Sequence, residues 1–201
     1  MGGGAKRLPR AVRERQMLDA AVEVFSHSGF HATSMDDIAT VAHISKPMLY
    51  LYLGSKDELF AACIRREAAR FLEAVIVDVR PELPPREQLA SGINSVFAFA
   101  AEHRDSWLVL YRQARLQQPF NQQAAAVHRQ VAGAVSELLQ QSAWGKHPAE
   151  HFDSLAIALV GAGEALIDQM LDQPEPDPQA SAAVLIDFAW HGLGGRRKAE
   201  P

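Results

Sequence analysis

Two short helices with N-terminal caps, joined by a tight turn between Thr33 and Lys56, constrain the fold of this chain more than any other feature. Ser34 stands where an N-cap is expected, and Asp37 follows it at the capping-box spacing. A second N-cap is expected at Ser45, only a few residues after the end of the first helix. Two capped helices so close together predict a helix-turn-helix motif.

The second of these helices is the candidate for insertion into the major groove of DNA. Pro47 lies in its first turn, where the missing N–H costs no hydrogen bond. Leu49 and Leu53 are four residues apart and are expected to face the core, which turns the intervening side chains toward other faces. The helix is therefore predicted to read base edges. The side chains on its other faces are Lys46, Met48, Tyr50 and Tyr52.

The overall charge argues against a generally basic surface. The chain of 201 residues has a formal net charge of −4, and basic and acidic side chains balance over residues 1–60. Any contact with DNA must therefore come from locally placed charge. A single cysteine, Cys63, excludes an internal disulfide framework, fits a reducing compartment and is expected to be an inert core thiol. Neither a signal-peptide core nor an apolar run approaching the roughly 20 residues of a membrane span is evident, so we expect a cytoplasmic protein without membrane contact.

The remainder of the chain is predicted to be helical, without strands or internal repeats. A first helix runs from about Pro9 to Ser28, ends at Gly29 and braces the motif. Prolines between 81 and 85 stop a long helix that begins after Ser55. Further helices are expected over 86–103, 105–117, 121–141, 148–171 and 177–192.

A longer pattern surrounds the motif, from an Ala-rich first helix to a Ser-Lys-x-Glu-Leu sequence. Its residues are Phe25, Gly29, Thr33, Ser34, Ile38, Ala39, Ile44, Ser45, Lys46, Leu49, Tyr50, Tyr52, Ser55, Lys56, Glu58, Leu59 and Phe60. This stretch, residues 10–65, closely resembles the DNA-binding domain of the TetR family of bacterial transcription regulators. The resemblance implies an all-α chain with a three-helix DNA-binding domain, followed by a helical domain for ligand binding and dimerisation. The expected divisions are a flexible basic arm over 1–9, the DNA-binding domain over 10–55 with its motif over about 34–53, a connecting helix over 56–80, the second domain over 81–195 and a tail over 196–201.

The second motif helix departs from the family pattern. Pro47 and Met48 stand where relatives often have Gly or Ala followed by Thr or Ser, so a hydroxyl that contacts phosphate is lost. Leu51 replaces a frequent Arg or His, and Leu53 a Phe. Met48 and Leu51 can contact a thymine methyl group but cannot form the bidentate hydrogen bonds that read a base pair.

Side-chain chemistry assigns the expected DNA contacts. Lys46, at the exposed start of the second helix, is the best candidate for a base edge or a phosphate, and Arg7 and Arg10 either reach DNA as an arm or belong to a solvated tail. Tyr50 has the alternative of a core tyrosine with its hydroxyl at the rim. The phosphate contacts are expected from Thr33, Tyr50, Tyr52 and Lys56, and the DNA-binding set is completed by Ser34, Ser45 and Met48.

An aromatic cluster in the second domain is the candidate lining of an effector site. It comprises Phe97, Phe99, His103, Trp107 and Tyr111, which combine apolar surface with polar tips. Such side chains suit a partly apolar small molecule between helices, although each alone is more often an ordinary core aromatic. The proposed ligand-binding residues are Phe97, His103, Trp107 and Tyr111.

The last two helices are the candidate dimer interface. Gly161 and Gly163 allow a second helix to approach closely, and apolar side chains on the final helix complete a possible two-fold four-helix contact. The alternative is tight packing within one subunit, and the family resemblance favours the interface. The proposed dimerisation residues are Gly161, Gly163, Leu166, Leu185 and Phe188.

No enzymatic site is expected. The string from His147 to His151, with Glu150, matches a short zinc-protease pattern, but Pro148 places His147 at or before a helix start. We therefore predict no metal and no cofactor, and a homodimeric regulator, most simply a repressor released from a palindromic operator by a small molecule. The alternatives are a DNA-organising or interaction module without an effector, and a helical metal-dependent enzyme.

Overall fold

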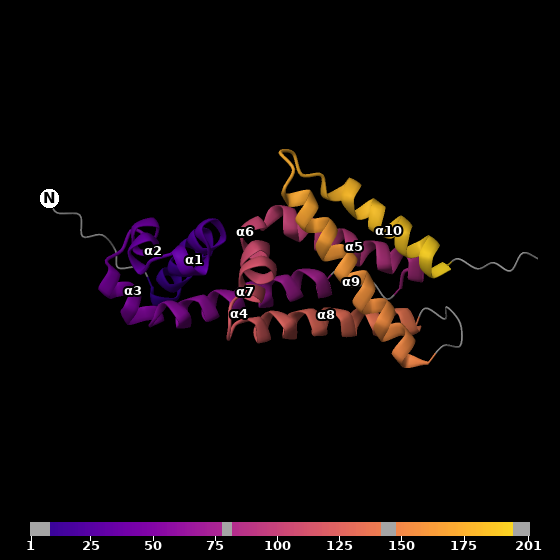
Figure 1. Cartoon of the computed structure of the whole chain (residues 1–201), viewed down its shortest axis with the longest axis horizontal. Coiled ribbons are helices and arrows are strands. Elements are labelled where there is room, and N and C mark those ends of the chain that lie inside the picture. Colours follow the sequence, from indigo (N-terminus) through magenta and orange to yellow (C-terminus); the bar gives the residue numbers. More distant parts are fainter. Residues whose placement is uncertain (1–8, 78–81, 142–147, 195–201) are drawn as a thin grey trace, which may run out of the picture. The chain divides into compact units, whose positions relative to one another are not determined.

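The structure, a computed structural model, describes residues 9–77, 82–141 and 148–194, and every element within these ranges is helical (Figure 1). The predicted all-α fold is confirmed. The elements are α1 (Arg10–Ala32), α2 (Met35–Val41), α3 (Lys46–Leu53), α4 (Lys56–Val77), α5 (Pro85–Glu102), α6 (Arg104–Trp107), the π-helical η1 (Leu108–Gln113), α7 (Ala114–Leu116), α8 (Asn121–Gln141), α9 (Ala149–Leu171) and α10 (Pro178–Gly194).

The chain forms two compact units that are not simply consecutive in sequence. The first comprises residues 1–67 together with 105–121, and the second comprises 68–104 together with 122–201. The division therefore falls within α4, after Glu67, and differs from the linear boundary that the prolines at 81–85 suggested. Segment 105–121, which the sequence placed in the second domain, groups with the helix-turn-helix.

An aromatic cluster forms much of the core of the first unit. The ring of Phe60, from α4, lies 4.8 Å from that of Phe25 and 5.0 Å from that of Phe30, both in α1. Phe120, which follows α7, completes the cluster at 5.0 Å from Phe60 and 5.5 Å from Phe30. Offset and edge-to-face contacts of this kind are favourable in addition to the apolar area that they bury. Segment 105–121 thus contributes an aromatic side chain to the core that supports the motif.

Gly29 breaks α1 close to where the sequence predicted its end. Its φ of 75° and ψ of 164° belong to a region that only glycine enters readily. A Cβ atom at this position would lie 3.2 Å from Oε1 of Gln113, in η1. The chain continues for one further short turn to Ala32, so α1 extends beyond the predicted end at Ser28 but bends at the predicted glycine.

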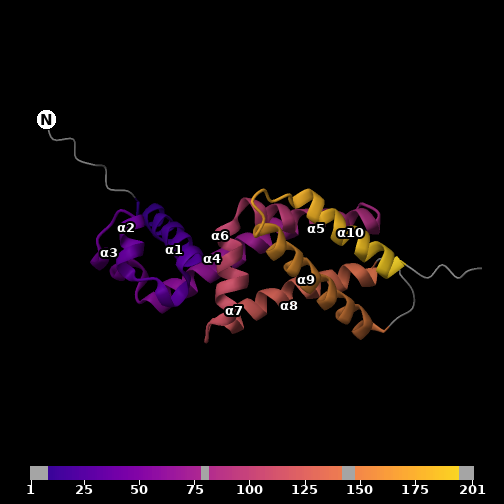
Figure 2. The same ribbon diagram turned by 45° about the horizontal axis from the view of Figure 1, so that its top comes forward.

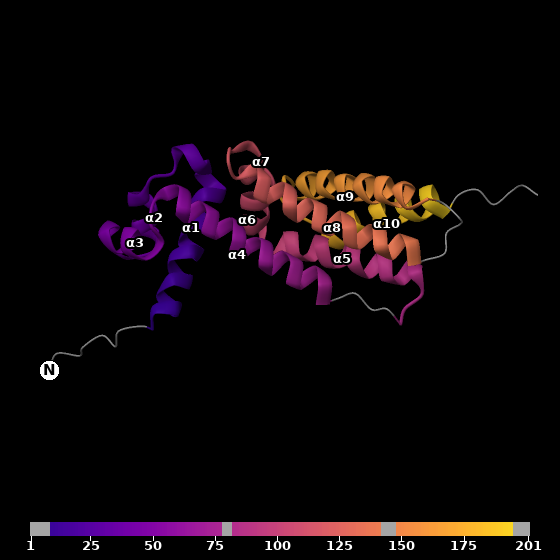
Figure 3. The same ribbon diagram turned by 90° about the horizontal axis from the view of Figure 1, so that it is seen from below.

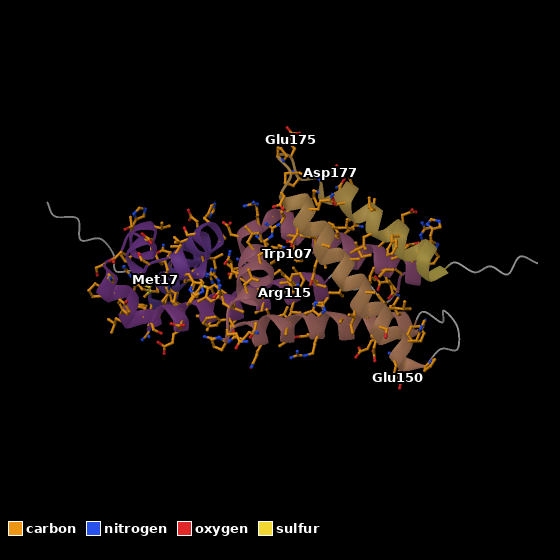
Figure 4. All side chains as sticks on the ribbon, viewed as in Figure 1. Met17, Trp107, Arg115, Glu150, Glu175 and Asp177 are labelled. Carbon is orange, nitrogen blue, oxygen red and sulfur yellow. The ribbon has the colours of Figure 1, made fainter. Side chains whose placement is uncertain are left out.

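Segment 105–121 contains most of α6, followed by η1 and α7, rather than the single helix predicted over 105–117. In η1 the backbone hydrogen bonds span five residues, as in the bond from the Ala114 amide to the Val109 carbonyl. The stacked rings of Trp107 and Tyr111 lie 4.0 Å apart, and both side chains are buried. Trp107 and Arg115 are labelled in Figure 4, as is Met17, a buried side chain of α1.

Helices α5, α8, α9 and α10 build the second unit, together with the part of α4 that follows Glu67. Helix α10 packs against both α5 and α9 (Figures 2 and 3). A smaller apolar cluster joins Leu139 of α8 to Phe152 and Ala156 of α9. The observed bounds of α8 coincide with the predicted range of 121–141, and those of α9 and α10 differ from prediction by at most two residues.

Helix α9 corrects the expectation that no apolar stretch of the chain approaches the length of a membrane span. Among the described helices, it is long and apolar enough to cross a membrane when judged by length and composition alone. Only about a third of its most apolar window is buried within the chain. The apolar surface that remains exposed on α9 therefore requires an explanation.

Candidate nucleic-acid interface

The capping box predicted for Ser34 and Asp37 is present at the start of α2. The Ser34 amide donates to Oδ2 of Asp37 at 2.9 Å, and the Asp37 amide donates to Oγ of Ser34 at 3.2 Å. The Ser34 hydroxyl and then its amide, both donating to the carboxylate, lower the pKa of Asp37. These reciprocal bonds satisfy amides that the helix leaves free and fix where α2 begins.

Helix α3 is oriented by its two buried leucines. Leu49 and Leu53 both face the core, as their spacing predicted. Pro47 occupies the first turn, and Ser45 holds the N-cap position, although its side chain forms no capping hydrogen bond. Between α2 and α3, His43 adopts a left-handed φ of 53°, which turns the backbone sharply in the short connection. The predicted helix-turn-helix geometry is therefore present.

The outward face of α3 carries one charged group, within a helix whose residues are all described. Nζ of Lys46 lies 2.7 Å from Oδ2 of Asp36, and this hydrogen bond raises the pKa of Lys46. Both side chains are largely exposed, so the ion pair is weak and DNA phosphates can compete for the ammonium group. Tyr50 is 47% exposed and Leu51 76% exposed, which places both on the solvent face. Tyr50 is thus not a core tyrosine in this structure.

Two of the residues predicted to contact phosphate, Thr33 and Lys56, form hydrogen bonds within the chain. The Thr33 hydroxyl is buried and donates to the Gly29 carbonyl at 2.7 Å. The ammonium group of Lys56 donates to the carbonyls of Phe30 at 2.9 Å and Thr33 at 3.0 Å, and it lies 4.6 Å from the centre of the Phe30 ring. Both side chains therefore stabilise the end of α1, and their contact with phosphate remains a prediction.

The remaining predicted contacts lie near α3 and α4. Tyr52 and Met48 are half-buried, and the guanidinium of Arg10 lies 5.4 Å from the centre of the Tyr52 ring. This cation–π contact associates the start of α1 with α3. Arg7 lies outside the described residues. Sequence reasoning missed the partner of Arg10, because the contact joins residues far apart in the chain.

Ser55, after which the sequence predicted the start of a long helix, caps α4 through a second capping box. The Ser55 amide donates to Oε2 of Glu58 at 2.8 Å, and the Glu58 amide donates to Oγ of Ser55 at 3.2 Å. The Ser55 amide and then its hydroxyl lower the pKa of the Glu58 carboxyl. Two capping boxes thus flank α3, one on each neighbouring helix.

The first unit also contains a buried polar network that was not predicted. Glu67 is fully buried in α4, where it accepts a hydrogen bond of 2.6 Å from Oγ of Ser106 and one of 2.5 Å from Nε of Arg66. Arg66 also pairs with Asp19 of α1 at 2.7 Å. One sequence signal was available, since Glu67 follows Ile64 by three residues and precedes Phe71 by four within an apolar stripe.

The four predicted effector-site residues divide between the two units. Trp107 and Tyr111 stack on one another in the first unit. Phe97 is buried in the second unit, where His103 follows the end of α5 and its ring lies 4.8 Å from that of Phe99. The grouping into one ligand site therefore remains a prediction.

The five predicted dimerisation residues also divide. Gly163 and Leu185 face one another within the chain, since a Cβ on Gly163 would lie 3.3 Å from a Leu185 methyl carbon. They serve the close packing of α9 on α10 that was the alternative to an interface. Gly161 is exposed, Leu166 is half-buried and Phe188 is 66% exposed.

Two further groups with reactive side chains, Glu164 and Cys63, are paired and buried respectively. His128 and Glu164 form a pair at 2.8 Å that joins α8 to α9. Burial raises the pKa of the Cys63 thiol to about 12, so it carries little thiolate. His147 lies outside the described residues, and within the described ones no group of three or more His, Cys, Asp or Glu is placed to hold a metal ion.

The compact capped motif, with a core-anchored second helix and an exposed outer face, defines a helix-turn-helix DNA-binding protein. Comparison with known families agrees. Residues 17–63 match the model of bacterial regulatory proteins of the tetR family, and residues 85–192 match a tetracycline repressor-like C-terminal domain. The chain belongs to the TetR family and is a DNA-binding transcriptional regulator.

Individual relatives cover most of the chain. The HTH-type transcriptional activator FasR of Mycolicibacterium smegmatis is 31% identical over 93% of this chain and 85% of its own length. The crystal structure of a TetR-like transcriptional regulator from Rhodococcus sp. RHA1 is 52% identical, with a TM-score of 0.83 over 94% of this chain and 100% of that one. FadR of Bacillus subtilis, solved in complex with stearoyl-CoA, shares the fold at 17% identity, with a TM-score of 0.71 over 87% of this chain and 96% of its own.

Proposed function

We propose that this regulator is a cytoplasmic homodimer that binds a palindromic operator and leaves it when a partly apolar small molecule binds. The observation that carries the proposal is the apolar surface on the last two helices. Three large apolar side chains there are each more than half exposed, namely Ile157 of α9 and Val184 and Phe188 of α10. Burial of such side chains against a second copy provides a driving force for dimerisation. It also accounts for the exposed apolar surface of α9.

A two-fold dimer matches the requirement for reading two half-sites. Helix α3 is eight residues long and exposes few side chains, so one copy contacts only a short stretch of bases. Two copies related by a two-fold axis read a palindrome whose half-sites are about one DNA turn apart. A ligand that favours another separation of the two α3 helices lowers the affinity for that operator.

The proposed effector is partly apolar. The aromatic residues Phe71, Phe97 and Phe99 are buried in the second unit, and the polar pair of His128 and Glu164 lies in the same unit. Apolar surface with a few polar groups is the usual composition of a small-molecule site. The stearoyl-CoA in the FadR structure supports the inclusion of long-chain acyl-CoA molecules in the first panel of ligands.

Activation is the second candidate mode of control, because the relative FasR is described as a transcriptional activator. The two modes differ in the effect of bound protein on transcription. Run-off transcription from a template that carries the operator decreases on addition of a repressor and increases on addition of an activator. Repression is the mode that we propose.

Light scattering tests the dimer. We expect the wild-type chain to have twice its mass of 22.0 kDa, and Phe188→Asp to approach 22.0 kDa. Leu116→Asp is the matched control, since Leu116 is similarly exposed, at 78%, but belongs to α7. A monomeric wild-type protein contradicts the proposed dimer.

Binding to operator DNA tests the remaining claims. The operator is first selected from random duplexes with the full chain, and its affinity is then measured with and without each ligand. We expect Tyr50→Phe to weaken binding to all sequences alike, because loss of a phosphate contact carries no sequence information. Selection of a single half-site, or operator affinity unchanged by every ligand in a broad panel, contradicts the proposal and favours an interaction module without an effector.

A further inference from the structure

The outward face of α3 is unusually poor in groups that can read bases by hydrogen bonds. Within this helix, all of whose residues the structure describes, the exposed side chains are Lys46, Pro47, Tyr50 and Leu51. Pro47 and Leu51 have no hydrogen-bonding side-chain group, so Lys46 and Tyr50 are the two exposed side chains of α3 that have one. Arginine, asparagine and glutamine, whose forked side chains form bidentate hydrogen bonds with bases, are absent from this helix.

Leu51 is the most exposed large side chain of this face. It lies two residues after Leu49 and two before Leu53, both of which are buried, so the core contacts of α3 hold Leu51 toward solvent. It is 76% exposed. An aliphatic side chain held in this way has apolar surface to bury when α3 enters the major groove.

The chemistry of the major groove limits what such a side chain can recognise. Among the four base-pair orientations, the C5 methyl group of thymine is the apolar feature on the groove edge. A leucine against the acceptors of guanine or the amino group of cytosine buries polar atoms without a partner, which is unfavourable. Contact with thymine buries apolar surface on both sides.

We propose that Leu51 recognises the C5 methyl group of one thymine in each operator half-site. The inference rests on the proposed binding of a palindrome by two copies of α3, and it specifies which chemical group of the DNA this residue selects. Sequence preference at that position then comes from a methyl contact rather than from a hydrogen bond.

The test uses operators selected from a random duplex library by the full-length protein. Each thymine is replaced in turn by deoxyuridine, which removes the methyl group and preserves base pairing. Affinity is measured by fluorescence anisotropy at fixed salt. We expect one symmetric pair of thymines at which each replacement weakens binding about fourfold, and the two together about fifteenfold, from the loss of a buried methyl group.

Variants assign the effect to the residue. Leu51→Ala should weaken binding to the thymine operator about fifteenfold, because both copies of the dimer carry the substitution. The variant should bind the thymine and uracil operators about equally. Leu116→Ala is the control, because it removes the same side chain at 78% exposure from α7 and should keep the wild-type ratio of the two affinities. Circular dichroism verifies that both variants are folded.

The possible failures are distinguishable. If the protein selects operators but binds them equally with thymine and uracil at every position, or if Leu51→Ala keeps the wild-type ratio, the methyl contact is wrong and operator binding stands. If no duplex is enriched, the proposed operator binding fails and the inference fails with it.

Discussion

Replacement of Ser106 by alanine tests whether the buried carboxylate of Glu67 holds segment 105–121 in the first unit. The Ser106 hydroxyl donates to Oε2 of Glu67 at 2.6 Å, and both residues are buried. Loss of a hydrogen bond to a buried charged group costs about 1.5–3 kcal/mol, because water cannot replace the donor. With a urea dependence of about 2 kcal/mol per molar, the unfolding midpoint should fall by roughly 1 M.

Ser136→Ala provides the matched control. Its hydroxyl also donates to a carboxylate at 2.6 Å, that of Asp153, and Ser136 is itself buried. Asp153 is exposed, however, so water can solvate the carboxylate in the variant, and we expect a loss of about 1 kcal/mol or less. Urea unfolding is followed by far-UV circular dichroism at one protein concentration, because dimerisation contributes to apparent stability. A loss for Ser106→Ala no larger than that for Ser136→Ala refutes the reasoning.

Three further predictions concern local features. Cys63, with a pKa of about 12, should react with a thiol reagent at pH 8 about a thousandfold more slowly in the folded protein than an exposed cysteine does, and at an ordinary rate in denaturant. Gly29→Ala should destabilise the protein by about 1–3 kcal/mol, because an alanine is strained at φ 75°, whereas Gly133→Ala, at an exposed position within α8, should stabilise it by about 0.5–1 kcal/mol. The pKa values of Asp37 and Glu58 are lowered in the folded state from 3.8 and 4.5. Their contribution to the free energy of unfolding is therefore present at neutral pH and is lost as pH falls through the lowered values. The double variant Asp37→Asn with Glu58→Gln should flatten this acid part of the profile of stability against pH.

For each of these three predictions, one experimental outcome would contradict the reasoning. A rapid native reaction of Cys63 contradicts its burial. Equal effects of alanine at Gly29 and Gly133 contradict the assigned backbone strain. An unchanged acid limb in the double variant of Asp37 and Glu58 contradicts the contribution of the capping boxes to stability.

Sequence patterns within a few residues of one another predicted the helix-turn-helix motif correctly. The Ser34 and Ser55 caps, the core-facing Leu49 and Leu53, and the break at Gly29 each depend on residues within a few positions of one another. Spacing and residue type are sufficient for such features. The family resemblance added the second domain, which local pattern alone describes only as further helices.

The contacts that sequence reasoning missed join distant parts of the chain. Phe120 packs with Phe30 and Phe60, and Ser106 donates to Glu67, across separations that periodicity does not address. The hydrogen bonds of Lys56 to the end of α1 were missed for the same reason. A lysine beside a predicted DNA surface was assigned to phosphate, because its intramolecular acceptors are backbone carbonyls that no side-chain pattern marks.

The placement of Phe120 and Ser106 has a consequence for attempts to transplant the DNA-binding half of this regulator. A fragment that ends at Glu67 loses the ring that packs on Phe30 and Phe60, and leaves a carboxylate without its serine donor. Chimeric regulators made by exchanging only the N-terminal segment therefore inherit an incomplete core. A functional exchange has to carry residues 105–121 as well, so the portable module of this protein is encoded in two separate pieces of its gene.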